Sequence, residues 1–242
     1  MTEWLWESGA ETITVGDRAG MGDTRTVMER AGAFELASDL GLETVVFDEL
    51  GPEDWVGQQA NHWSRGFPLA RPAMDADSVV LACCLKTHRF GGHFTLSLKN
   101  SVGMVAKQIP GEGYNYMTEL HNSSHQRRMI AEVNAAYTPD LVVIDGIDAF
   151  TTGGPDRGTE VHAQVVLAGA DRVALDAVGV ALLRYYGTTR EVSSGPIFEQ
   201  EQIARAVELG LGVSSPEGIE FVTDDPESND YAELLQPILM GR

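Results

Sequence analysis

The residues best suited to bind an anion lie within one stretch of the chain, CCLKTHRFGGHFTLSLKNSVGMVAK, at residues 83–107. This stretch contains every lysine of the 242 residues, Lys86, Lys99 and Lys107, and it also contains His88. Lysine is a compact point charge whose pKa falls on burial, which suits catalysis or a tight anion site. We therefore expect Lys86, His88 and Lys99 to form a pocket, with Lys107 at its rim. The alternative is that the lysines pair with some of the 36 acidic residues.

Two glycines and an amide accompany these side chains. Gly91 and Gly92 permit a positive φ and a close approach of the backbone to a ligand. Asn100 follows Lys99 and adds an amide group. Together these residues predict a pocket for a phosphate or carboxylate group, with His88 as the acid or base.

A second candidate segment is LVVIDGIDAFTTGGPDRG, which has an aspartate at the end of an apolar run. Asp145 could orient His88, bind a metal or act as a general base. It could equally be a cap or turn residue. Gly153 and Gly154 follow in a loop that we expect to contact the ligand.

Histidines and one buried carboxylate raise further possibilities. His121 and His125 are four residues apart, a spacing that places both on one helix face and suits a divalent metal. They lose this common face if the helix begins only at Ser123. Asp176 lies in an apolar helical pattern, so it needs a partner, and Lys86 or Lys99 is a candidate.

The elements that must position these residues alternate between strand and helix. This alternation predicts βαβ units and a single α/β domain with a mainly parallel sheet flanked by helices. The carboxyl ends of such strands would bring the candidate residues together. We assign residues 1–223 to this domain and residues 224–242 to a loosely attached polar tail. Strands are expected at 11–16, 43–48, 78–84, 140–145 and 163–168, and helices at 24–41, 123–137, 171–186 and 197–209.

The charge of the chain excludes some functions. Its formal net charge is −19, which disfavours nucleic acid and anionic membranes as partners. High acidity with few lysines suggests a protein of a salt-rich, halophilic cytoplasm. No apolar run is long enough to span a membrane. The adjacent Cys83 and Cys84 argue against a disulfide scaffold, and two cysteines cannot hold a four-cysteine iron–sulfur cluster.

Several motifs in order resemble the domain-of-unknown-function family 362. They are LKTHRFGGHFTLSLKNSVGMV, a histidine before a helix (His121), PDLVVIDGIDAFTTGGPDRG and VVLAGADRVALDAVGVALL. The resemblance covers roughly residues 8 to 222 and implies an α/β fold. Members typically begin with a further βαβ segment that has no counterpart here, so we expect a homodimer or an incomplete pocket. Many relatives are associated with iron–sulfur proteins, which implies a redox partner rather than a cluster in this chain.

Two classes of function remain open. As an enzyme, the protein would bind a small anionic substrate at Lys86, Lys99 and Asn100, with His88 and Asp145 assisting the reaction. As a non-catalytic module, it would bind a cofactor or a redox partner protein in the same pocket. A further alternative is a similarity of THRFGGHFTLSLK to nickel-pincer lactate racemases, in which a histidine and a lysine hold a nicotinate-derived cofactor.

Overall fold

The computed structural model describes all residues from Met1 to Arg242, and the chain forms two compact units. Each unit is assembled from three segments. The first unit contains residues 1–58, 67–75 and 103–117, and the second contains residues 59–66, 76–102 and 118–242. No helix is both long enough and apolar enough to cross a membrane.

The first unit contains a small parallel βαβ arrangement, as the sequence predicts. Strand β1 (Thr14–Asp17) pairs with β2 (Glu43–Val46) in parallel register. The expected helix between them is divided in two, because Gly32 adopts a φ of 72° that interrupts the regular helix. The other elements of this unit are α1 (Thr2–Glu7), α2 (Thr24–Arg30), α3 (Ala33–Leu40), α4 (Arg71–Met74) and the antiparallel pair β3 (Trp55–Gln58) and β4 (Phe67–Ala70).

The second unit is built on a four-stranded mixed sheet of order β6-β5-β7-β8. Only β5 and β7 run parallel, whereas β5 with β6 and β7 with β8 are antiparallel. The prediction of one mainly parallel sheet is therefore wrong, although all five predicted strands are present. The strands of this sheet are β5 (Val80–His88), β6 (His93–Thr95), β7 (Leu141–Gly153) and β8 (Gly158–Gly169).

The error has a physical cause at the β7–β8 connection. Only four residues separate Gly153 from Gly158, and a parallel connection needs a dozen or more. The glycine loop therefore closes a hairpin. Strand β5 alternates between the buried Leu81 and Cys83 and the exposed Ala82 and Cys84. This alternation is typical of a sheet with one covered face.

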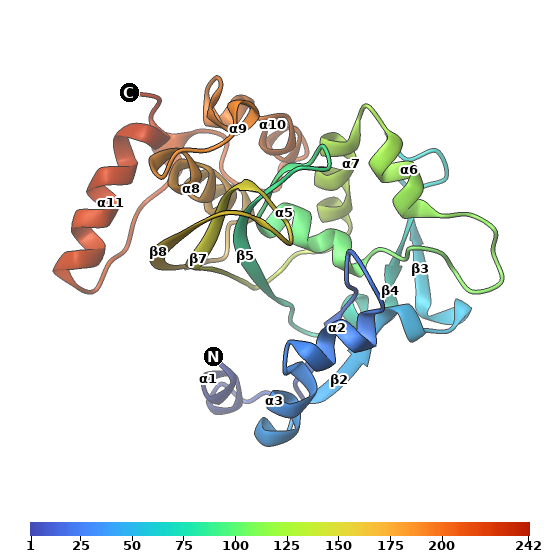
Figure 1. Cartoon of the computed structure of the whole chain (residues 1–242). Helices are drawn as coiled ribbons and strands as arrows, with labels where there is room; N and C mark the ends of the chain where they lie inside the picture. Colours follow the sequence, from blue (N-terminus) through green and yellow to red (C-terminus); the bar gives the residue numbers. More distant parts are fainter. The chain divides into compact units, whose positions relative to one another are not determined.

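Helices pack on the covered face of this sheet (Figure 1). Helix α8 (Arg172–Tyr185) is almost entirely buried, and Asp171 caps it by accepting hydrogen bonds from the amides of Val173 (2.8 Å) and Ala174 (2.9 Å). The remaining helices of the unit are α5 (Ser97–Asn100), α6 (Tyr116–Asn122, which begins in the first unit), α7 (Gln126–Val133), α9 (Arg190–Ser193), α10 (Glu201–Glu208) and α11 (Pro226–Leu239).

The segment expected to be a polar tail contains a packed helix. Helix α11 buries Leu235 and Leu239, and it lies beside α8 in Figure 1. The hydroxyls of Tyr231 on α11 and Tyr186 are 2.7 Å apart, and they also tie this helix to the end of α8. The domain boundary at residue 223 remains a prediction.

Candidate functional site

The candidate site begins at the carboxyl end of β5, where Lys86, Thr87 and His88 are the last residues of the strand. The chain then turns through Gly91, whose φ of 83° favours glycine, and returns as β6 from His93. The Gly91–Gly92 pair therefore makes the hairpin, and it places the turn beside His88.

Both glycines are needed for close packing. A Cβ atom at Gly92 would lie 2.8 Å from Cε of Lys99 and 2.9 Å from Nδ1 of His88. A Cβ atom at Gly91 would collide with the side-chain oxygen of Gln126. The backbone of the turn is thus the point at which His88, Lys99 and Gln126 meet.

His88 is buried in an electropositive environment. Only 7% of the surface of this residue is exposed to solvent, and its Nδ1 atom has no hydrogen-bond partner. Burial is the main cause that lowers the pKa of His88 to about 2, and the charges of Lys99, His121, Lys86 and Arg89 lower it further. The imidazole is therefore neutral near pH 7 and is surrounded by groups that attract an anion.

A buried carboxylate holds Lys99 in place. Lys99 belongs to the short helix α5, whose first residue, Ser97, donates its backbone N–H (2.8 Å) and its hydroxyl (2.5 Å) to Asp176. Asp176 is fully buried, and burial raises its pKa to about 7 although these hydrogen bonds act in the opposite direction. The sequence suggested a lysine as the partner of Asp176, whereas the structure places Ser97 and the amide of Leu98 there.

A cavity of about 330 Å³ opens beside His88. It lies within the second unit, and one glycine of each predicted pair, Gly91 and Gly153, lines it. The carbonyl of Gly154 accepts hydrogen bonds from the backbone N–H (3.3 Å) and the guanidinium (2.8 Å) of Arg89, and this attaches the glycine loop of β7 to the end of β5. The lining residues are Thr87, His88, Arg89, Gly91, His93, Gly153, Thr189 and Glu191.

Other predicted residues lie elsewhere. Lys86 lines a separate cavity of about 160 Å³. Asp145 is exposed and accepts a hydrogen bond from the amide of Ile147 (2.9 Å). It pairs with Cys84, four residues before His88, a separation of about 13 Å along the strand. Asn100 is half-buried beside Lys99.

Lys107 belongs to the first unit, where its ammonium group pairs with Asp48 at 2.7 Å. Lys107 therefore forms an ion pair with an acidic residue, which was the alternative interpretation for all three lysines.

The histidine pair proposed for a metal is divided between two helix ends. Helix α6 ends at Asn122 and α7 begins at Gln126, so His121 and His125 do not share a helix face. The ring of His121 lies 6.4 Å from that of His88, and the ring of His125 lies 4.9 Å from that of His62. His121 therefore belongs to the surroundings of His88.

Several residues of the site were not predicted. Arg127 donates to the carbonyl of Gly91 (2.8 Å) and pairs with Glu201 (2.7 Å). Gln126 is buried, and its amide nitrogen has no hydrogen-bond partner. The positions of Arg89 and His93 inside the HRFGGH segment were a usable signal, whereas nothing in the sequence around residue 126 indicated a part in this site.

These observations define an α/β protein with a cavity beside the buried His88, where a strand and two glycine loops meet. Residues 1–181 match the family described as Domain of unknown function (DUF362), and the chain belongs to this family. This confirms the resemblance seen in the motifs.

The chain is also similar to a cyanobacterial protein. A thylakoid-associated protein of Synechocystis sp. is 29% identical over 244 residues, and the match covers 100% of this chain and 70% of the other protein. No solved structure matches the chain significantly.

Proposed function

We propose that the protein binds a small molecule carrying a phosphate or carboxylate group in the cavity beside His88. The observation that carries the proposal is the buried imidazole with an unpartnered Nδ1 atom among Lys99, Arg89 and Lys86. Burying cations and an unsatisfied polar atom costs free energy, and an anion would offset that cost.

Each part of the site has a role in this proposal. Lys99 supplies a buried positive charge, and Arg89, which is exposed and also pairs with Asp156, supplies a second positive charge beside the glycine loop. Gly91 and Gly92 allow the ligand to approach the backbone. The unpartnered amide nitrogen of Gln126 offers a further donor next to Gly91.

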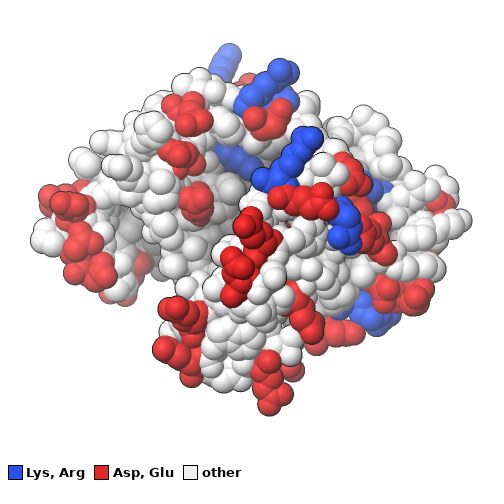
Figure 2. Space-filling view, turned by 60° about the horizontal axis from the view of Figure 1, so that its bottom comes forward, with Lys and Arg blue, Asp and Glu red and all other residues white.

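The wider surface favours a contained site over a broad basic patch. In Figure 2 acidic side chains are spread over the visible face, and the basic ones lie close to acidic ones. Because the net charge is −19, a free anion is repelled at long range. We therefore expect binding to depend on short-range hydrogen bonds and on the local charge of Lys99.

The test uses the two lysines as a matched pair. Lys99→Met should weaken binding of inorganic phosphate or succinate at least tenfold in isothermal titration calorimetry, since the loss of a charged hydrogen bond costs about 1.5–3 kcal/mol. Lys107→Met removes the same charge from a partly exposed ion pair with Asp48 and should leave binding unchanged. Arg89→Gln provides a second variant if Lys99→Met fails to fold.

Two outcomes would contradict the proposal. One is that neither anion binds the unmodified protein. The other is that Lys99→Met and Lys107→Met have equal effects on affinity.

A catalytic role for His88 is the second candidate, and its unpartnered Nδ1 atom favours it. A bound anion would offset the neighbouring cations and raise the pKa of His88, which makes the imidazole a better base. Calorimetry at pH 6.5 in buffers of different ionisation enthalpy should then show proton uptake on binding. His88→Gln should abolish this uptake, and turnover of the ligand would distinguish an enzyme from a binding module.

A further inference from the structure

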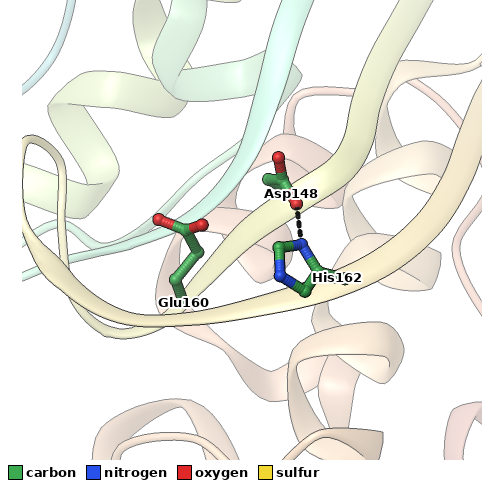
Figure 3. A group of neighbouring side chains, drawn as sticks. All are labelled: Asp148, Glu160 and His162. Atoms are coloured by element: carbon green, nitrogen blue, oxygen red, sulfur yellow. Dashed lines mark hydrogen bonds and ion pairs between the residues drawn. The ribbon is translucent and has the colours of Figure 1, made fainter.

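A second group of side chains lies on the β7–β8 hairpin, outside the cavity beside His88. Asp148 on β7 and His162 on β8 are direct cross-strand partners, and Glu160 lies two residues before His162 on the same face. Figure 3 shows the three side chains converging above the hairpin. Each offers one ligand atom, and these atoms all lie within 4.8 Å of one another.

The hydrogen bond within the group assigns different roles to its members. Nδ1 of His162 bonds to Oδ1 of Asp148, so the ring orientation is fixed. In Figure 3 the other ring nitrogen, Nε2, is on the side of Glu160. A carboxylate that orients a histidine while the far nitrogen binds a metal is a common arrangement in metalloproteins.

The surroundings can accommodate a hydrated ion. Asp148 and Glu160 line the cavity of about 160 Å³ that also contains Lys86. All three side chains of the group are exposed, so water can complete the coordination. The net charge of −19 raises the local concentration of cations near the surface.

We propose that this hairpin binds a divalent transition metal ion of the Zn²⁺ type. Nε2 of His162 and a carboxylate oxygen of Glu160 are the direct ligands, and Asp148 positions the imidazole. An imidazole combined with carboxylates suits zinc and its neighbours, whereas Ca²⁺ and Mg²⁺ prefer sites made of oxygen alone.

The experiment is a titration of the whole protein with ZnCl₂ by isothermal titration calorimetry. We expect one ion to bind per chain. Binding should be lost in His162→Ala and in Glu160→Gln. Asp148→Asn should weaken it about 10- to 100-fold, as is usual for a partner that only orients a ligand.

The controls separate this site from nonspecific binding by an acidic surface. Glu35→Gln removes one exposed carboxylate from the first unit and should bind Zn²⁺ as the unmodified protein does. Far-UV circular dichroism will verify that the hairpin variants fold. Absence of binding would overturn the proposal. An affinity of His162→Ala within twofold of the original value would overturn it as well.

Discussion

The depressed pKa of His88 makes the stability of the folded protein depend on pH. The ordinary pKa of histidine is 6.5, and in the folded protein it is lowered to about 2, mainly by burial. The unfolded chain therefore binds one more proton between these two values. Stability is fully present above pH 6.5, and it falls as the pH decreases through the window from about 6.5 towards about 2.

The size of the effect follows from proton linkage. With these two pKa values, His88 should cost about 1.4 kcal/mol of unfolding free energy between pH 7.5 and 5.5, and about 2.7 kcal/mol by pH 4.5. Asp176 acts in the opposite direction, because burial raises its pKa to about 7. The total stability of the protein is therefore not a clean measure of His88.

A comparison with His88→Gln isolates the effect, since Asp176 and the other titrating groups are common to both proteins. Urea unfolding followed by tryptophan fluorescence gives the free energy of unfolding at each pH. Trp63 reports on the second unit, because its indole N–H is held by the carbonyl of Met129 (3.1 Å). The advantage of the original protein over the variant should shrink as the pH falls.

A difference between the two proteins that stays constant from pH 7.5 to 4.5 would refute the reasoning. It would mean that the imidazole becomes protonated as easily in the folded protein as in the unfolded chain. The side-chain NMR signals of His88 provide a direct check, since they should not titrate above pH 5.

Two further predictions concern the turn and the surface charge. Gly92→Ala should destabilise the protein by about 1–3 kcal/mol in urea unfolding and should abolish phosphate binding, because the added methyl group meets Lys99 and His88. The control is Gly113→Ala, whose added methyl group meets nothing within 4 Å and should change neither stability nor binding. Equal effects of the two substitutions would contradict the prediction. Raising KCl from dilute to molar concentration should increase the melting temperature, because salt screens the repulsion within a chain of net charge −19, and a lower melting temperature in molar KCl would remove the halophilic hypothesis.

The strands were predictable from the sequence, but their directions were not all predictable. Apolar runs bounded by glycine or aspartate located β5, β7 and β8, because burial selects such runs whatever the strand direction. The loop between Gly153 and Gly158 was short enough to exclude a parallel crossover. The alternation of strand and helix patterns along the chain predicts a parallel sheet and does not take this short loop into account.

The candidate site was predicted in part, for reasons that depend on distance along the chain. His88, Gly91 and Gly92 are neighbours in one turn, so their proximity follows from sequence. Asp145 was expected at the same edge of the sheet, but β7 continues to Gly153, so the end of the strand lies eight residues beyond Asp145. The contact of Gln126 with Gly91 joins a helix to a hairpin, and only the packed fold reveals it.

The segment composition of the two units has a consequence for experiments that divide the protein. The chain passes from one unit to the other five times, near residues 58, 66, 75, 102 and 117. A cut near residue 58 leaves every segment of the second unit on one fragment, and a cut near residue 117 leaves every segment of the first unit on one fragment, whereas cuts near residues 66, 75 and 102 divide both units. A nick near residue 66, 75 or 102 leaves two fragments that both contribute segments to both units, so we expect these fragments to remain associated through packing within each unit. Gene fragments that stop near residue 58, 66, 75 or 102 should yield chains without the complete core of either unit, whereas one that stops near residue 117 contains every segment of the first unit.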